Sequence, residues 1–445
     1  MSVCPLEFRY GREKMKKIFS EETRLQYILD VEAALAGAHA RAGNMLPEHA
    51  ELIRKSANIK IVSLARVSEV DKQINHEITA IVRTLSEQSG EGGKYVHLGA
   101  TSNDILDTAA ALQIRDALTI IDDDLLNFRT ALAELADRHR CTIMIGRTHG
   151  QYALPITFGL KMAIYSLEVN RQIERVHQLM PRICVGKMSG AVGTGAGLGP
   201  KALEIQKHVM DKLNLGIEEG PSQIVGRDRY IELISVLSNI ATTIEKIATE
   251  IRNLQRSDIG EVFEAFDAKR QVGSSTMAHK RNPVTAENVC GLARVVRGYM
   301  TPTFESAVLW HERDLTNSSA ERFTIPHSFI LLDDILAKMD KLMRLLVINK
   351  DRMMQNLKNA GAQIMAESVI VALVEKGMGR QDAHELLRQC TIECVDNGKD
   401  FKCTLQEQDE ITKLLCEEEL DKCLMPESYL GVTDKTIDNI LAKYK

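Results

Sequence analysis

The chain has 445 residues, with 56 Lys and Arg against 61 Asp and Glu, which gives a formal net charge of −5. Roughly 150 residues per domain predicts about three domains. The charge balance excludes a general nucleic-acid binder, because there is no surplus of cations to neutralise phosphates. Hydrophobic residues make up 44% of the chain, which excludes a disordered protein, and only 4% are aromatic. Abundant Leu, Ile, Ala and Met therefore favour helices over sheets.

Residues 1–106 consist of short segments broken by residues such as Gly11, Gly43 and Pro47, and we predict a small N-terminal helical domain. The first residues, MSVCPLEFRYGREKMKK, carry charges where a secretory signal needs an apolar run, so no signal peptide is expected. No run of 18 apolar residues occurs, so we expect no membrane partner. Nine scattered cysteines, an odd number, are typical of a reducing compartment, and we predict a cytoplasmic protein.

Three central stretches, 100–145, 227–259 and 327–360, contain neither glycine nor proline. Each is far longer than the usual helix of about 11–12 residues. In the second stretch apolar residues step by four and three, the spacing of a helix-packing seam, at Ile240, Ile244, Ile247, Ile251 and Leu254. We predict an all-α fold of three helical domains in which residues 107–360 form a bundle of very long helices. Such helices exceed one monomer's core, so we expect a homo-oligomer.

After Gly361 the segments shorten again, and we predict a C-terminal helical domain over residues 361–445. Five of the nine cysteines lie in this part of the chain, near His384, and a zinc site is one interpretation of them. No C-x-x-C pair is present, however, and the spacing of Cys390 and Cys394 places both on one face of a helix. We favour ordinary helix packing and expect no metal site.

Three segments between the long helices are dense in small and polar residues, and function is expected there. The first, residues 97–109, contains the run Thr101-Ser102-Asn103-Asp104. Ser, Asn and Asp are typical N-cap residues, so a helix cap is the commoner interpretation. The exposed N–H groups of a helix start also attract anions, so an anion site is the alternative.

The second segment, residues 145–159, places His149 between Thr148 and Gly150. A histidine between small residues can approach a ligand closely, and it titrates near neutral pH, as a proton donor requires. A lone histidine is as often only a hydrogen-bonded loop residue. The residues alone leave the two interpretations even.

The third segment, residues 271–288, is the most unusual in the chain. GSS at 273–275 provides hydroxyls and backbone donors, and KRN at 280–282 adds two cations and an amide before Pro283. Together these groups suit a site for a multiply negative substrate. A solvated basic turn is the alternative, and composition does not decide between them.

The order GSSTMAHKRNP resembles the signature of the fumarase/aspartase superfamily, whose members eliminate fumarate from substituted succinates. LGATSNDILDTA and GRTHGQ are similar to that superfamily's two other active-site regions and occur in the same order, so the resemblance covers the whole chain. Further features are similar to the adenylosuccinate lyase family: Arg9-Tyr10, Asn75-His76-Glu77, the segment from Gln223 to Arg229, KRN within the signature, Ser318-Ser319 before Arg322, and IMAESVIVALVEKGMGRQDAHELLRQC near the C-terminus.

This resemblance implies a C–N lyase of purine biosynthesis. The expected reactions release fumarate from adenylosuccinate, giving AMP, and from succinylaminoimidazole carboxamide ribotide, giving AICAR. The resemblance implies that Ser274 is the general base and that His149 is the general acid for the departing nitrogen. A serine is a poor base at its free pKa, so its alkoxide needs loop N–H groups and a nearby cation, for which Lys280 is the candidate.

The resemblance also implies the substrate contacts. Thr101 and Ser102, with Lys280 and Asn282, are expected to stabilise the charge that develops on the carboxylate. His76 is expected to assist or orient His149. The phosphate side is expected to use Arg9, Tyr10, Arg313, Ser318 and Arg322. The remaining expected substrate contacts are Asn75, Glu77, Gln223, Ser275 and Arg281.

The family fold implies a homotetramer in which each active site takes residues from three subunits, with no metal or organic cofactor. The glycine-rich segment 190–200 fits neither G-x-G-x-x-G nor a P-loop, and we expect a loop there. Two residues depart from the family pattern: Ala278 stands where proline is usual, which predicts a more flexible signature loop, and Glu77 stands where aspartate is common.

Two alternatives remain. One is another lyase of the superfamily, an argininosuccinate lyase or a carboxymuconate cycloisomerase, and the other is an inactive structural homologue. Four active-site groups, His149, Ser274, Lys280 and Asn282, are all retained, which favours an active enzyme over the structural homologue.

Overall fold

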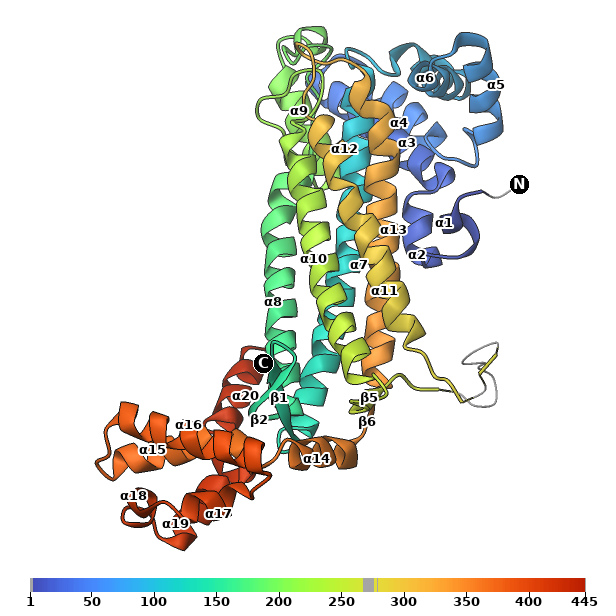
Figure 1. Cartoon of the computed structure of the whole chain (residues 1–445). Coiled ribbons are helices and arrows are strands. Elements are labelled where there is room, and N and C mark those ends of the chain that lie inside the picture. The colour runs from blue at the N-terminus through green and yellow to red at the C-terminus, as the bar shows by residue number, and fades with distance from the viewer. Residues whose placement is uncertain (1–2, 267–275, 278, 445) are drawn as a thin grey trace. The chain divides into compact units, whose positions relative to one another are not determined.

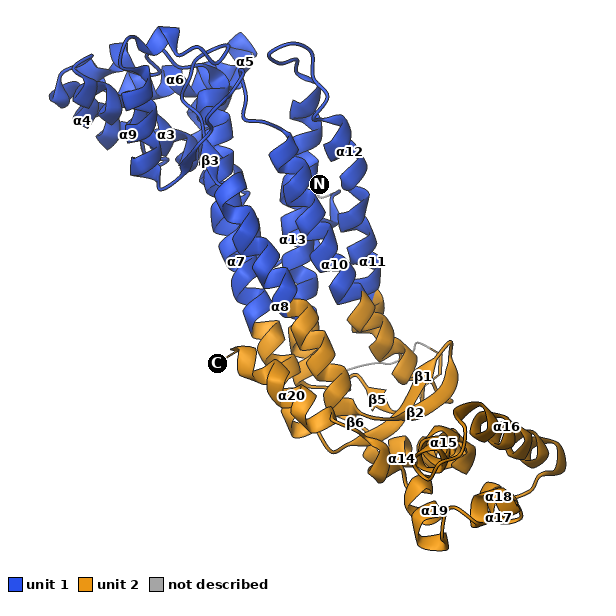
Figure 2. Ribbon diagram, turned by 90° about the vertical axis from the view of Figure 1, so that its left-hand side faces the viewer, with its two compact units in different colours: residues 1–126, 170–245, 288–338 blue, residues 127–169, 246–287, 339–445 orange. Residues whose placement is uncertain are grey.

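The structure is a computed structural model that describes residues 3–266, 276–277 and 279–444 (Figure 1). The described residues are predominantly helical, so the all-α prediction is confirmed. The chain divides into two compact units, coloured separately in Figure 2. Unit 1 comprises residues 1–126, 170–245 and 288–338, and unit 2 comprises residues 127–169, 246–287 and 339–445. The division into three successive domains stays a prediction.

Five long helices contribute residues to both units. They are α7 (Ser102–Arg138), α8 (Phe158–Ile183), α10 (Asp228–Leu254), α11 (Val284–Gly298) and α13 (Thr316–Arg344). Within unit 1 their segments run side by side as a bundle (Figures 1 and 2).

The other elements of unit 1 are mostly short helices that precede the bundle or connect its members. They are α1 (Pro5–Phe8), α2 (Glu13–Ile18), α3 (Glu21–Ala42), α4 (Pro47–Ser56), α5 (Leu64–Ile74), α6 (Glu77–Gln88), α9 (Ala202–Leu213), α12 (Met300–Glu305), the 3₁₀ turns η1 (Gly90–Tyr95) and η2 (Ala196–Leu198), and the paired strands β3 (Val185–Gly186) and β4 (Gly216–Ile217). Helix α3 packs against α4 and α9, and Leu29, Ile53 and Val209 are fully buried there.

Unit 2 combines two small antiparallel sheets with the C-terminal helices. Its elements are β1 (Ile143–Thr148), β2 (Gln151–Thr157), β5 (Val262–Phe263), β6 (Val347–Ile348), α14 (Lys350–Asn359), η3 (Ala362–Met365), α15 (Ala366–Glu375), α16 (Arg380–Asn397), α17 (Phe401–Gln406), α18 (Asp409–Thr412), α19 (Glu417–Leu424), η4 (Pro426–Tyr429), α20 (Thr433–Leu441) and η5 (Ala442–Tyr444). Strand β1 pairs with β2, and β5 pairs with β6.

The long glycine-free stretches form the helices expected of them, but the first also contains the start of β1 and the third departs further. The first two contain α7 and α10, and the predicted seam of α10, from Ile240 to Leu254, is at most 2% exposed. In the third stretch α13 ends at Arg344, and β6 and α14 follow. The helix stops because Val347 and Ile348, both β-branched, pair with the distant strand β5.

The C-terminal helices of unit 2 enclose a small apolar core. Cys390 and Cys394 lie in it on α16, 1% and 9% exposed, together with Phe401 and Leu405. Among the described residues, no group of three or more His, Cys, Asp or Glu side chains is placed to hold a metal ion. Their burial among apolar side chains makes these two cysteines part of the core packing.

Helix length and hydropathy determine whether the described part of the chain could span a membrane. No single helix there is both long enough and apolar enough to cross a bilayer. One pair, α14 with residues 362–375, passes the length and composition test only when the two are taken together, and it bends by 84°.

Charged residues attach the N-terminal segment to two long helices of unit 1. The Arg12 guanidinium donates from Nε to Asp333 of α13 at 2.8 Å, and its Nη2 contacts both Asp333 and Asp124 of α7. Lys14 donates to Asp124 at 3.2 Å. The Asp333 side chain is fully buried, and this burial, with the nearby Asp124 charge, raises the pKa of Asp333 to about 6 although Arg12 opposes the shift.

Because the pKa of Asp333 is raised from an ordinary 3.8, the folded chain binds this proton more tightly than the unfolded chain. The contribution of this proton to the free energy of unfolding is fully present below pH 3.8 and is lost as the pH rises through about 6. We expect urea unfolding to show a fall in the free energy of unfolding over that interval, by about 1–3 kcal/mol. Asp333→Asn should flatten the fall, whereas Asp340→Asn, at a surface pair of the same helix, should retain it. Equal pH dependence in both variants would contradict this assignment.

Candidate active site

The first candidate segment contains a buried carboxylate that binds four donors. Asp104, in the first turn of α7, accepts the N–H groups of Thr101 at 2.8 Å, Ser189 at 2.8 Å and Gly190 at 3.0 Å. The fourth donor is Nζ of Lys187, at 2.5 Å, and neither side chain of this ion pair has any exposed surface. Asp104 thus caps α7 by reaching back to Thr101, so the cap interpretation is correct, and the anion-site interpretation remains compatible with it.

The glycine-rich segment 190–200 is a loop with one 3₁₀ turn, η2, and it packs against the Thr101 turn. Gly99 has a φ of 71°, and a Cβ added there would lie 2.3 Å from the carbonyl oxygen of Gly197. Only glycine therefore permits this contact between the two backbones. Gly99 and Gly197 therefore serve the packing of the two loops.

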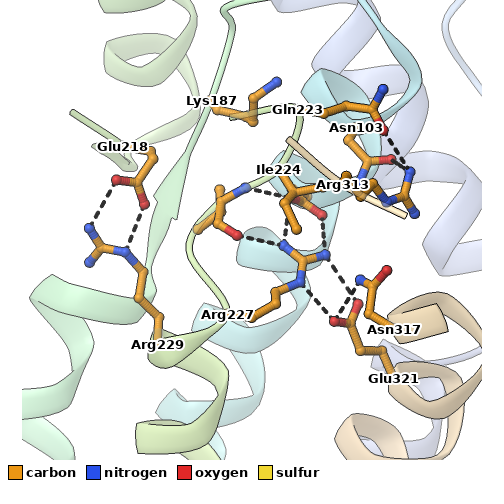
Figure 3. Close-up of polar contacts among 12 residues, drawn as sticks. Asn103, Lys187, Glu218, Gln223, Ile224, Arg227, Arg229, Arg313, Asn317 and Glu321 are labelled. Atoms are coloured by element: carbon orange, nitrogen blue, oxygen red, sulfur yellow. Dashed lines mark hydrogen bonds and ion pairs between the residues drawn. The ribbon is translucent and has the colours of Figure 1, made fainter. Parts of the chain in front are cut away.

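Next to this turn, Arg227 is neutralised by two carboxylates (Figure 3). Its guanidinium donates to Asp107 at 2.8 and 3.0 Å and to Glu321 at 2.7 and 3.1 Å. Burial alone would lower the pKa of Arg227, but the charges of Asp107 and Glu321 outweigh it and raise that pKa well above its ordinary value. The ion pairs join the starts of α7, α10 and α13.

Within the part of the chain that the structure describes, Arg313 has no such carboxylate partner. Its Nη1 donates only to neutral side-chain oxygens, Asn103 Oδ1 at 3.2 Å and Gln223 Oε1 at 3.1 Å (Figure 3). Its Nε is buried and has no hydrogen-bond partner among the described residues. Burial is the main cause that lowers the pKa of Arg313. A buried guanidinium held by two amides is suited to receive an anionic ligand.

A cavity of about 670 Å³ lies beside Arg313 in unit 1. Of the five residues predicted to contact the phosphate, Arg313, Ser318 and Arg322 line it. The other two do not. Arg9 is exposed at the end of α1, and Tyr10 faces the ammonium of Lys338, which is 5.1 Å from its ring centroid.

The predicted trio at residues 75–77 lies where α5 meets α6, by a second cavity of about 520 Å³. Asn75 ends α5 with a φ of 50°, and His76 Nδ1 accepts the Thr79 N–H at 3.3 Å, so His76 caps α6. Glu77 forms ion pairs with Arg24 and Arg322. Four of the predicted substrate contacts thus touch one another in unit 1: Gln223 contacts Arg313, and Glu77 contacts Arg322.

In unit 2 the segment around His149 forms a β-hairpin rather than the expected loop. Thr148 pairs with Gln151, and His149 and Gly150 make the two-residue turn with φ of 53° and 75°, typical of a type I′ turn. The His149 side chain is exposed at the tip. Below it, Arg147 forms a bidentate pair with the buried Glu261 at 2.9 and 2.8 Å. This ion pair therefore anchors the hairpin whose tip carries His149.

The signature segment is described only in part. Ser274, Ser275 and Ala278 lie outside the described residues. Lys280 and Arg281 are exposed, and Lys280 and Asn282 line a cavity of about 1050 Å³ in unit 2 with cations that include Arg252 and Arg256. The Arg281 guanidinium lies 4.9 Å from the Phe266 ring centroid. The Gln255 side-chain amide donates to the backbone carbonyl of Arg281 at 3.2 Å.

Sequence reasoning missed several residues at these sites. Asn103 lies within the Thr-Ser-Asn-Asp run and could have been included as a neighbour of Ser102. Lys187 precedes the glycine-rich segment and gave no signal, because its role depends on contact with Asp104, 83 residues away. Arg24 likewise meets Glu77 only in the folded chain.

Comparison with known proteins supports this architecture. The family model described as "Lyase" matches residues 7–298, and the one described as "Adenylosuccinate lyase C-terminus" matches residues 362–440. Among solved structures, a fumarate lyase from Mesorhizobium sp. BNC1 superposes with a TM-score of 0.89 at 33% identity, covering 97% of this chain and 98% of that one. A 3-carboxy-cis,cis-muconate lactonizing enzyme from Pseudomonas putida gives 0.88 at 32% identity, covering 100% and 99%.

The fold and the retained motifs thus define a lyase of the fumarate-releasing class. Within that class, the adenylosuccinate lyase of Pyrococcus abyssi is 50% identical over 99% of this chain and 98% of its own length. The chain belongs to the adenylosuccinate lyase family, and the resemblance predicted from the motifs is confirmed.

The buried pair of Lys187 and Asp104 gives a stability prediction. Lys187→Met should destabilise the chain by about 3–5 kcal/mol, because it leaves the Asp104 carboxylate buried without its cation. Lys207→Met is the matched control, since Lys207 pairs with Asp211 at 2.7 Å on the exposed surface of α9 and should contribute little. Urea unfolding measures both variants. Equal effects would show that the buried pair contributes no more than a surface pair.

Proposed function

We propose that the chain cleaves fumarate from adenylosuccinate, giving AMP, and from succinylaminoimidazole carboxamide ribotide, giving AICAR, as an enzyme of purine biosynthesis. The observation that carries this proposal is the full-length similarity to the Pyrococcus abyssi adenylosuccinate lyase. Retention of His149, Ser274, Lys280 and Asn282 in the sequence supports an active enzyme.

The proposed reaction is a β-elimination with two acid–base groups. Ser274 removes a proton from the carbon beside a succinyl carboxylate, and the electron pair left on that carbon forms the fumarate double bond as the C–N bond breaks. His149 donates a proton to the departing nitrogen. The exposed position of His149 at the hairpin tip suits a group that must reach a bound substrate. Lys280 and loop N–H groups stabilise the Ser274 alkoxide.

The substrate's charges are assigned to separate groups. We assign the phosphate to Arg313, Ser318 and Arg322, because all three line the larger cavity of unit 1 and Arg313 donates to two neutral amide oxygens. We assign the succinyl carboxylates of the substrate to Thr101 and Ser102 at the start of α7, together with Lys280 and Asn282. The free energy of phosphate binding then serves to position the reacting succinyl group.

We further propose a homotetramer whose active sites combine residues of different subunits. Large apolar side chains on the long helices support it, because a lone chain would leave them in water: Ile164 of α8, Val295 of α11 and Phe323 of α13 are 49%, 45% and 60% exposed. We place the enzyme in the cytoplasm. All nine cysteines are thiols rather than disulfides, which supports a reducing compartment.

The direct test is a fumarate-release assay with purified protein and four compounds. We expect release from adenylosuccinate and from its imidazole carboxamide counterpart, and no reaction with argininosuccinate or 3-carboxy-cis,cis-muconate. Release from argininosuccinate alone, or turnover of the muconate alone, would replace the proposed function with that of another lyase of the superfamily.

Loss of either acid–base group should abolish most of the activity. Ser274→Ala and His149→Gln should each lower kcat by about 10²–10⁴-fold while the protein still binds AMP. His177→Gln provides the control, since His177 is an exposed histidine of α8 that pairs with Asp122. A variant that keeps wild-type kcat removes its residue from the mechanism.

The two inactive variants also test the shared site. If His149 and Ser274 of one site come from different subunits, a mixture of the two variants that has been dissociated and reassembled regains activity, because some sites receive both wild-type residues. If each subunit supplies a complete site, the mixture stays inactive.

A further inference from the structure

Three charged residues from distant parts of unit 1 meet through a single carboxylate. Arg24 lies in the first turn of α3, Glu77 begins α6, and Arg322 lies in the second turn of α13. Glu77 accepts from Arg24 at Oε1 and from Arg322 at Oε2, the latter at 2.8 Å. Burial would raise the pKa of Glu77, but the two guanidiniums outweigh it and lower that pKa, so the carboxylate is ionised. A second carboxylate, that of Glu21, lies 3.8 Å from Arg24, but its side chain is 69% exposed, so Glu77 is the closer partner of both arginines.

Both arginines retain donors for a ligand. A guanidinium has more N–H groups than these contacts with Glu77 use. The Arg24 and Arg322 side chains are 21% and 57% exposed, and both line the cavity of about 670 Å³ and the cavity of about 520 Å³. The pair therefore stands between two spaces that a small molecule can enter.

The other charges lining the cavities indicate which one suits an anion. The smaller cavity is also lined by Asp71, Glu21 and Glu77 itself, so carboxylates outnumber its two arginines. The larger one is lined by five cations, the arginine pair with Lys16, Arg227 and Arg313, against four acids, Glu7, Glu21, Asp107 and Glu321. Two of these acids, Asp107 and Glu321, are engaged by Arg227. An anion is therefore favoured on the side of the larger cavity.

Ser318 adds a hydroxyl at the same place. It lies four residues before Arg322 on α13, on the same face of the helix, and it lines the larger cavity. Ser318 and Arg322 are already assigned to the phosphate, and Arg24 is tied to Arg322 through one carboxylate. Two guanidiniums and a hydroxyl match the several oxygen atoms of a phosphate.

We propose that Arg24 is a further phosphate-binding residue, which Glu77 holds beside Arg322 so that two guanidiniums bind the substrate's phosphate from the larger cavity. This inference rests on the proposed function for the identity of the substrate. It adds a residue from α3 that no motif of the sequence marked.

The test compares adenylosuccinate with the same compound lacking its phosphate, succinyladenosine. For Arg24→Gln we expect KM for adenylosuccinate to rise about tenfold or more, as loss of a charged hydrogen bond predicts. KM for succinyladenosine should not change. Arg24→Lys, which keeps the charge but not the fork, should fall between wild type and Arg24→Gln. Arg54→Gln, at an exposed pair with Glu51 on α4, is the control and should match wild type with both compounds.

Equal KM changes for the two compounds, or none, would overturn the proposal, because a phosphate contact must discriminate between them. A second measurement does not depend on turnover. Inorganic phosphate should raise the Tm of wild-type protein at fixed ionic strength and raise that of Arg24→Gln much less. If wild-type protein releases no fumarate, the proposed function fails, and this measurement still decides whether Arg24 binds phosphate. The same phosphate-induced shift in both proteins would refute the role of Arg24.

Discussion

The geometry of the first candidate segment, residues 97–109, depends on one buried carboxylate. Asp104 accepts hydrogen bonds from the start of its own helix, from the backbone at 189–190 and from the ammonium of Lys187. An ionised carboxylate without exposed surface is tolerable only when its oxygen atoms are satisfied in this way. The pair costs desolvation energy, so its value lies in geometry: it places the Thr101–Ser102 turn relative to the glycine-rich loop and leaves few alternative arrangements.

A second principle is the uneven neutralisation of arginines in unit 1. Arg227 is held between Asp107 and Glu321 and is therefore structural, whereas Arg313 is held by Asn103 and Gln223, whose amide oxygens carry no charge. The first arrangement satisfies the cation within the protein, and the second leaves it available to a ligand. An acidic chain can in this way present an available cation to a ligand, and its net charge of −5 does not determine the local field.

Much of the fold could be predicted because its signals are local. The absence of glycine and proline, and the four-and-three spacing from Ile240 to Leu254, are properties of single helices. The end of α13 at Arg344 was missed because it depends on β5, more than 80 residues earlier. The hairpin at 143–157 was missed because small and polar residues around His149 resemble a loop, whereas the pairing of its strands decides the structure.

The residues of the candidate site also divide into those that local motifs predict and those that only the folded chain reveals. Motif resemblance marked Gln223, Arg313 and Arg322, and the structure brings the first two into contact. It did not mark Arg24 or Lys187, since each acts through a carboxylate on another element, Glu77 or Asp104. Arg9 and Tyr10 were marked, but neither lines the larger cavity of unit 1. Resemblance transfers residue identities, whereas pairing between distant helices follows from the packing of this chain.

The contact of Gly99 with Gly197 limits how this enzyme can be changed by engineering. A Cβ at Gly99 would lie 2.3 Å from the Gly197 carbonyl oxygen, and a Cβ at Gly197 would lie 3.0 Å from that of Gly99. A side chain introduced at Gly99 will therefore clash with the Gly197 backbone, and one at Gly197 will be tightly restricted by Gly99, whatever new chemistry it introduces. Redesign of substrate preference here has to treat residues 97–101 and 190–199 as one unit and vary them together.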